Sequence, residues 1–139
     1  MINVVLDTNV LMAAPIKKDG VNRAALRKVI DSSGIFRICY SSQMADEYVE
    51  ALRRHPISSR GLTSEADALL ALVLDVGEQI VPKFIPAIVY PDDRDRPFLE
   101  AAVYANAILL TNNLRDFPFL GVKVVAPGEF LDWCNHSGC

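Results

Sequence analysis

The stretch INVVLDTNVLM, residues 2–12, gives the strongest indication of the fold. Its first part, residues 2–6, is a continuous apolar run rich in β-branched residues, which is typical of a strand buried on both faces of a parallel sheet. The run stops at Asp7, and the chain passes through Thr8 and Asn9 before it becomes apolar again. We therefore expect a central strand with a carboxylate at its carboxyl end.

The composition bounds the class of protein. The chain has 139 residues, 51% of them hydrophobic, so we expect a single domain over residues 1–139 with a substantial core. The net charge of -3 gives no overall positive field to attract a polyanion. No window is apolar over the length of a membrane span, and the N-terminus lacks the pattern of a secretory signal. Together with only three cysteines, this predicts a cytoplasmic protein without membrane association.

Helical and strand-like patterns alternate along the rest of the chain. The predicted helices cover residues 20–33, 42–54 and 97–107, a segment from a cap at Thr63 or Ser64 to Gly77, and a closing segment from Gly128. The predicted further strands cover residues 35–40, 108–111 and 122–127, and Pro82, Pro86 and Pro91 favour an extended connection over residues 79–93. Strands separated by helices form parallel crossovers, so the pattern predicts an α/β fold, a three-layer α/β/α sandwich with a central mostly parallel sheet.

Acidic and polar residues follow two of the predicted strands. Asp7 ends the first strand, and Asn113 and Asp116 follow the strand at 108–111. Ligands of such sheets bind beyond the carboxyl ends of the strands, and both loops open there. The run DDRD, residues 92–95, precedes the helix that leads into the later strand. Its place relative to this edge stays open, because a helix can begin near either end of a sheet.

Glu47 differs from the other acids of its helix. Met44 and Ala51, three residues before it and four after it, place Glu47 on the apolar stripe, whereas Asp46 and Glu50 lie on the polar face. A carboxylate that points inward is costly unless a cation or hydrogen bonds compensate it. Glu47 is therefore a candidate functional residue.

Each of these signals also has a plain structural explanation. Asp7 could be an N-cap or turn residue, the acids of residues 92–95 could complement a helix dipole, and Glu47 could pair with a buried arginine. Acids that converge on one crevice, however, raise each other's pKa unless a metal ion lies between them. Oxygen ligands suit Mg²⁺ or Mn²⁺, and no pair of histidines has the spacing of a zinc site.

Three segments together resemble the PIN-domain ribonucleases, in particular the VapC-like toxins of toxin–antitoxin systems. They are VVLDTNVLM at residues 4–12, SSQMADEYVEALRRHP at residues 41–56 and DDRDRPFLEAAVYANAILLTNNLRDFP at residues 92–118. The resemblance extends from Asn3 to about Phe130, and its specificity comes from the order of the acidic blocks. It implies that Asp7, Glu47 and Asp95 are catalytic residues and metal ligands, with Asp93 as the alternative for the third position.

The fourth acidic position of the family falls in the loop after residues 108–111. There this chain has Asn113 where many relatives have aspartate, so either Asp116 takes over as metal ligand or a neutral amide does. Asn9 and Thr111 match polar positions that shape the active site of the family. This departure at Asn113 bears directly on how strongly the site would bind a metal.

The resemblance implies Mg²⁺-dependent or Mn²⁺-dependent hydrolysis of RNA, with an antitoxin protein as partner and a homodimer as the assembly. Basic residues within 17–28 and at 53–55 could follow an RNA backbone, or they could simply be solvated helix faces. Two other classes stay open. One is a metal-dependent phosphatase with Asp7 as nucleophile, which is disfavoured because Asn9 stands where a second aspartate is usual. The other is a weakly active or inactive domain that binds RNA or protein.

Overall fold

The computed structural model describes residues 1–85, 93–117 and 121–137, and within them five parallel strands form one sheet in the order β3-β2-β1-β4-β5. The strands are β1 (Ile2–Leu6), β2 (Phe36–Tyr40), β3 (Glu78–Gln79), β4 (Ile108–Leu110) and β5 (Val124–Val125). The helices are α1 (Thr8–Ile16), α2 (Val21–Asp31), α3 (Ser42–Leu52), α4 (Thr63–Val76), α5 (Arg96–Ala105) and α6 (Pro127–Ser137). Two short 3₁₀ turns are η1 (Asp93–Asp95) and η2 (Leu114–Asp116).

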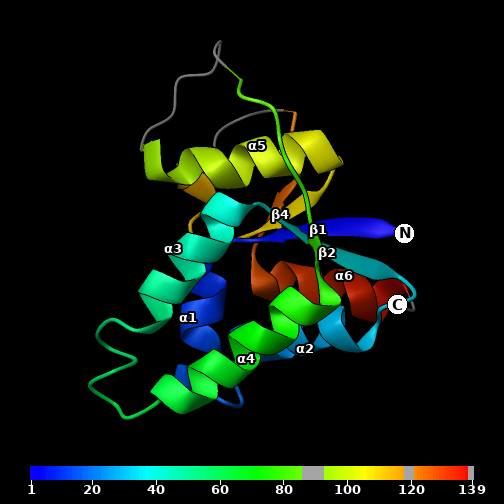
Figure 1. Ribbon diagram of the computed structural model, residues 1–139. Coiled ribbons are helices and arrows are strands. Elements are labelled where there is room, and N and C mark those ends of the chain that lie inside the picture. Colours follow the sequence, from blue (N-terminus) through cyan, green and yellow to red (C-terminus); the bar gives the residue numbers. More distant parts are fainter. Residues whose placement is uncertain (86–92, 118–120, 138–139) are drawn as a thin grey trace.

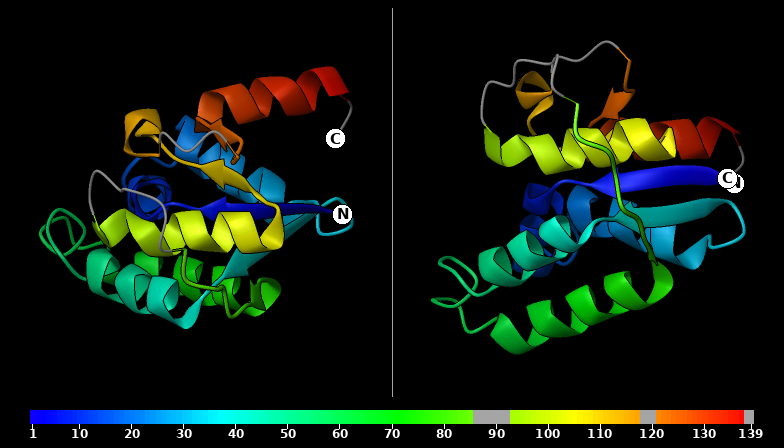
Figure 2. Two further views of the ribbon diagram at one scale, coloured as in Figure 1. Left: turned by 90° about the horizontal axis from the view of Figure 1, so that it is seen from above. Right: turned by 45° about the horizontal axis from the view of Figure 1, so that its top comes forward.

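The helices form layers on the two faces of the sheet (Figure 1). Helix α5 covers one face, where it contacts β1, β2 and β4, and α1, α2, α4 and α6 lie on the other side. Helix α3 stands at the end toward which β1 points and contacts both α1 and α5, as the two turned views also show (Figure 2). The predicted three-layer α/β/α sandwich is confirmed.

The central strand is as buried as the sequence predicts. Val4, Val5 and Leu6 have no exposed surface, and each such side chain stabilises the fold by roughly 1.5–3 kcal/mol relative to an exposed one. Val4 pairs with Ile38 of β2 on one side and with Ile108 of β4 on the other. The middle of β1 is therefore held from both sides, and its end is held by β4.

Helix α1 is the element that the sequence pattern does not predict. It begins directly after Asp7, and none of its residues is exposed: one broad side is buried, and the other side is half-buried. Met12, Ala13 and Ile16 make the half-buried side apolar as well, so the sequence lacks the 3.6-residue alternation of apolar and polar residues by which amphipathic helices are recognised. Pro15 adds a second misleading signal, because a proline removes the hydrogen bond to the carbonyl four residues before it and argues against a helix interior; α1 ends one residue later.

Strand β3 is also absent from the prediction, because two residues are too few to carry a pattern. It pairs with β2 through Cys39 and Glu78 and then leads into the segment 80–85, which is extended as predicted. The rest of the predicted connection, with Pro86, Pro91 and Asp92, lies outside the described residues. The other predicted elements agree with the structure to within about two residues at most ends, as is usual for element boundaries.

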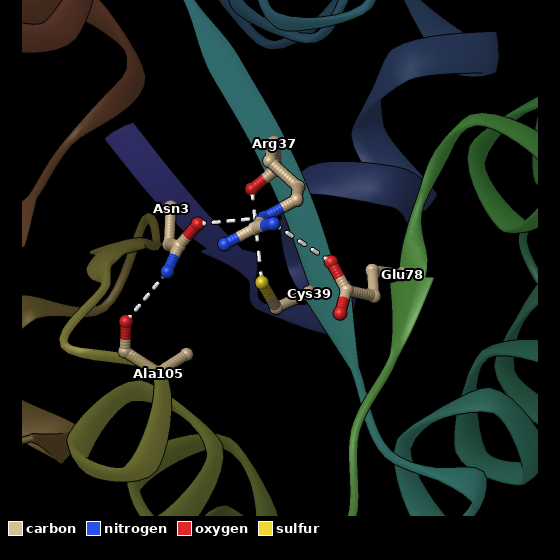
Figure 3. Close-up of polar contacts among 5 residues, drawn as sticks. All are labelled: Asn3, Arg37, Cys39, Glu78 and Ala105. Atoms are coloured by element: carbon tan, nitrogen blue, oxygen red, sulfur yellow. Dashed lines mark hydrogen bonds and ion pairs between the residues drawn. The ribbon is translucent and has the colours of Figure 1, made fainter. Parts of the chain in front are cut away.

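A polar cluster on the α5 side of the sheet joins four elements near the amino ends of β1 and β2 (Figure 3). Arg37 donates from Nε to Asn3 Oδ1 at 3.0 Å, and its Nη1 pairs with Glu78 Oε2 at 3.0 Å. Asn3 Nδ2 donates to the carbonyl oxygen of Ala105 at 2.7 Å, and Cys39 Sγ lies 3.9 Å from the Arg37 carbonyl. This cluster connects β1, β2 and β3 to the end of α5.

None of the described helices combines the length and the apolar character that a bilayer crossing needs.

Candidate functional site

The carboxyl ends of β1 and β4 lie side by side and place two predicted site residues together. Leu6 pairs with Leu110, and the Asp7 amide donates to the Leu110 carbonyl at 2.9 Å. The next residues along the two strands are therefore Asp7 and Thr111. This register puts the acid that follows the first strand beside the loop that follows the fourth.

A cleft of about 690 Å³ opens in front of these strand ends, between α1, α3 and the start of α5. Among the described residues, seven carboxylates line it: Asp7, Asp46, Glu47, Glu50, Asp93, Asp95 and Asp116. Arg54 and Arg94 are the basic residues in its wall, and Asn9 and Asn113 line it as well. All the acids predicted from the sequence thus reach one cleft, and the two acids assigned to the polar face of the α3 helix reach it too.

Asp7 lies at the buried end of this cleft and is only 7% exposed. Its Oδ1 accepts a hydrogen bond from the amide of Thr8 at 2.7 Å, and its Oδ2 accepts one from the hydroxyl of Thr111 at 2.6 Å. Asp7 is thus the N-cap of α1, which is the structural role that its sequence position also allowed. At the same time its carboxylate lines the cleft.

The pKa of Asp7 is raised above its ordinary value. Burial is the largest cause, because it removes water from the charged form. The hydrogen bonds from Thr111 and Thr8 lower the pKa in part, and the nearby carboxylates of Glu47 and Asp116 raise it again. A negative charge at Asp7 is therefore unfavourable in the protein alone, and a bound cation would relieve it.

Glu47 is half-buried and turns toward α1, in agreement with its place on the apolar stripe. Its Oε2 accepts a hydrogen bond from the Thr8 hydroxyl at 2.5 Å. The next residue, Tyr48, is completely buried and donates its hydroxyl to the carbonyl oxygen of Leu6 at the end of β1. Burial, and secondly the charges of Asp7 and Glu47, raise the pKa of Tyr48 well above its usual range. Tyr48 thus fixes α3 so that Glu47 faces Asp7.

The acids before α5 lie in the 3₁₀ turn η1, which resolves a question that the sequence leaves open. Both Asp93 and Asp95 line the cleft, so this turn belongs to the same edge of the sheet as Asp7. Asp93 is exposed and Asp95 is half-buried. The geometry does not choose between them as the third acid of the family.

The loop after β4 carries the fourth acidic region. Asp116 is half-buried in η2 and lies near enough to Asp7 to raise its pKa, whereas Asn113 is exposed at the cleft. The amide of Asn113 donates to the Thr111 hydroxyl oxygen at 3.0 Å, so this residue helps to orient the hydroxyl that holds Asp7. Asp116 is therefore placed where it could supply the carboxylate that position 113 lacks.

A chain of side-chain amides, which sequence reasoning missed, extends from the site to α2. Asn9 Nδ2 donates to the Thr111 hydroxyl oxygen at 3.4 Å, and Asn9 Oδ1 accepts from the backbone amide of Asn112 at 3.2 Å. Asn112 Nδ2 in turn donates to Asn22 Oδ1 at 2.8 Å. The repeated asparagines of the TNN segment are a weak signal for such a role, but nothing in the sequence links them to residue 22.

The donor set suits a hard divalent cation held in an open site. In the described part of the chain, no group of three or more histidine, cysteine or acidic residues is arranged closely enough to hold a metal ion by itself. Mg²⁺ does not require such a cage, because it keeps several waters and is commonly bound by one or two carboxylates together with substrate phosphates. A desolvated Asp7 with Glu47 and Asp116 nearby provides oxygen donors and a surplus of negative charge.

Comparison with known proteins adds a family and a fold. A family model described as a PIN domain matches residues 3–115, which include every predicted site residue except Asp116. No curated protein matches the chain.

Two solved structures resemble the fold. The structure of VapBC2 from Rickettsia felis, bound to a DNA fragment from its promoter, has a TM-score of 0.61 and 17% identity, with 90% of this chain and 98% of that chain covered. The structure of DNA-bound VapBC from Salmonella typhimurium has a TM-score of 0.61 and 19% identity, with 91% and 99% covered. At these identities the likeness establishes the fold alone.

Proposed function

Because the chain belongs to the PIN domain family, we propose that it is an endoribonuclease that hydrolyses phosphodiester bonds of RNA with Mg²⁺ or Mn²⁺. The observation that carries this proposal is the desolvated Asp7 carboxylate at the end of a cleft lined by further acids. The nearby carboxylates of Glu47 and Asp116 raise the pKa of Asp7 further, so the negative charge of the site is not compensated in the protein alone. A divalent cation that binds a phosphate would compensate it.

The residues of the site have separate tasks in this proposal. Asp7, Glu47 and one of Asp93 and Asp95 would hold the ion, with Asp116 as a further candidate ligand. When bound, the ion polarises the phosphate and lowers the pKa of a water molecule. The amide of Thr8 and the hydroxyl of Thr111 keep both Asp7 oxygens at fixed positions. Such preorganisation matters because a displaced ligand would misplace the phosphate.

A biological role as the toxin of a toxin–antitoxin pair rests on likeness to the two VapBC structures. We propose that an antitoxin protein binds this chain, and that the chain forms a homodimer in the cytoplasm. Light scattering of the purified protein would measure its mass. A monomer at micromolar concentration would contradict the dimer without affecting the nuclease proposal.

The experiment that tests the nuclease proposal is cleavage of a mixed single-stranded RNA by the purified protein with Mg²⁺, with Mn²⁺ or with EDTA. The Asp7→Asn variant, purified in parallel, reveals any contaminating nuclease. We expect cleavage that requires the metal and is lost in the variant. Equal cleavage by both proteins would mean that the cleavage comes from a contaminating nuclease or does not need Asp7, and in either case it would not support the proposal.

A second candidate is a domain that has kept the fold and binds RNA or protein without cleaving it. It is favoured by the exposed amide of Asn113 at the fourth acidic position and by the lack of a three-ligand group among the described residues. Calorimetric titration with Mg²⁺ separates the two candidates. Folded protein that neither binds the ion nor cleaves RNA would support the second.

A further inference from the structure

A second pocket, of about 320 Å³, adjoins the acid-lined cleft. It lies between the start of α3, the end of β3 with the segment 80–85, and the start of α5. Gln43 and Pro97 belong to the walls of both cavities. A polymer that passes through the cleft would therefore meet this pocket next.

The aromatic ring of Phe84 forms part of the wall and is unusually accessible. Phe84 is 64% exposed, and the guanidinium carbon of Arg96 lies 4.3 Å from its ring centroid. The cation occupies one side of the ring, and the exposed surface leaves the rest of the ring open to a ligand. An aromatic ring backed by arginine is the platform on which proteins stack the bases of single-stranded nucleic acids.

The platform is fixed to the core instead of lying loosely on the surface. Glu100 of α5 is buried, and its Oε2 accepts a hydrogen bond of 2.7 Å from the backbone amide of Ile85, the residue after Phe84. This bond attaches the segment 80–85 to α5. A preorganised platform loses little conformational entropy when it binds, which favours a ligand-binding role over a random surface position.

The remaining walls combine flat apolar surface with groups that form hydrogen bonds. Ile80 and Pro82 supply apolar contacts, and Gln43, Gln79 and the Glu100 carboxylate supply donors and acceptors. Such a combination suits a flat heterocycle with a polar edge, since small-molecule sites are mostly apolar with a few placed polar groups. A carboxylate accepts hydrogen bonds from the amino and imino groups that the bases carry.

We propose that this pocket binds one nucleobase of the RNA strand, stacked on Phe84, beside the phosphate that enters the acid-lined cleft. The inference rests on the proposed function, because it takes RNA as the occupant of the cleft. It adds a base-binding subsite that is separate from the metal site. Continuity of the two cavities and the Phe84 platform are the observations that favour RNA as the occupant.

Stacking can be measured directly with a fluorescent residue in place of Phe84. Trp133 is the only tryptophan of the chain and lies on α6, so a Phe84→Trp, Trp133→Phe protein reports on the pocket alone. An added Asp7→Asn substitution keeps RNA intact. We expect a single-stranded RNA tetranucleotide to quench the fluorescence in a saturable manner and inorganic phosphate to leave it unchanged. The matched control is Asp7→Asn protein with Trp133 and Phe84 retained, which should not respond.

Kinetics provide the second measurement. We expect Phe84→Ala to raise KM for RNA roughly tenfold with little change in kcat, because stacking contributes to binding of the strand. Phe84→Tyr should restore KM. Tyr104→Ala, which removes an aromatic ring that is 53% exposed near the end of α5, should leave KM unchanged.

The outcomes separate this inference from the proposed function. Saturable quenching without cleavage by the natural sequence would contradict the nuclease and support the pocket. Cleavage by the natural sequence, with unchanged KM in Phe84→Ala and no quenching, would overturn the pocket and leave the nuclease intact. Absence of both cleavage and quenching would overturn both.

Discussion

Two polar clusters lie at opposite ends of the same parallel sheet, and they differ in how their charges are compensated. Near the amino ends of the strands, Arg37 pairs with Glu78 and donates to Asn3, which donates to a backbone carbonyl of α5 (Figure 3). Beyond the carboxyl ends, seven carboxylates face two arginines in one cleft, counted over residues 1–85, 93–117 and 121–137. The first cluster is complete within the fold, whereas the second carries a surplus of negative charge.

The difference in burial makes this contrast informative. The side chains of Arg37 and Glu78 are 43% and 53% exposed, so their ion pair stabilises the fold only slightly. Asp7 is almost completely buried beside other acids, and its ionisation opposes folding. A stable but uncompensated arrangement of this kind is typical of a binding or catalytic site, where perturbed pKa values gather.

The largest expected difference between the two clusters is in the rate of RNA cleavage after one acid of each cluster is neutralised. We expect Asp7→Asn to lower the rate of RNA cleavage by at least about 100-fold, an effect of the size seen when one charge-stabilising group is removed from an active site. Glu78→Gln is the matched control, which should cleave RNA at the natural rate. Single-turnover assays on both variants measure the effect. Similar losses of cleavage rate in Asp7→Asn and Glu78→Gln would contradict the functional difference between the two clusters.

A smaller effect is expected from Thr111→Val, which keeps the shape of a buried side chain and removes its hydroxyl. The Thr111 hydrogen bond lowers the pKa of Asp7, so its loss should raise that pKa further. Because Mg²⁺ binds the ionised carboxylate, the pH at which Mg²⁺ affinity falls should move upward. Calorimetric titrations over a range of pH values measure this. An unchanged pH dependence would show that the hydroxyl has no influence on the Asp7 charge.

The stabilisation of the protein by Mg²⁺, measured as a rise in Tm, should depend on pH. The folded-state pKa of Asp7 is raised, so the stability contribution of the protonated form is lost as the pH rises through that pKa. Bound Mg²⁺ should reverse this loss at neutral pH, by about 2.7 kcal/mol of unfolding free energy when the free ion is at about 100 times Kd. The rise in Tm should shrink as the pH falls toward the ordinary range of carboxylic acids. A constant rise at every pH would argue for binding elsewhere.

The smallest effect belongs to the compensated cluster. We expect Arg37→Met to lower the free energy of unfolding by about 1 kcal/mol or less, because exposed ion pairs contribute little. Denaturant titration measures this, and RNA cleavage should be unaffected. A loss of several kcal/mol would show that the cluster in Figure 3 organises the sheet more strongly than its exposure indicates.

The sequence predicted the layered fold because its signals are local. The run at residues 2–6 and the amphipathic helices carry patterns that depend on near neighbours, and the resulting elements agree with the structure. Helix α1 escaped prediction because its sequence is apolar on nearly every side, and β3 because it has two residues. Both omissions follow from the absence of periodicity and not from an unusual structure.

Some features of the candidate site could also be predicted from the sequence, and others could not. Gathering of the acids could be inferred, since strand ends of a parallel sheet share an edge. The hydrogen bond between Asn112 and Asn22 could not, because it joins residues 90 positions apart that no local pattern connects. The choice between Asp93 and Asp95 is still a prediction to be tested, because the turn η1 presents both to the cleft.

The hydrogen bond between Thr111 and Asp7 spans 104 positions of the chain. Strand β4 can pair with β1 only after both strands and all the residues between them have been synthesised, so a nascent chain carries Asp7 long before it carries the group that positions it. For a protein proposed to cut RNA, the order of synthesis therefore acts as a delay. The site is complete only after the chain has been synthesised through β4, and a truncated product that ends before β4 would lack it.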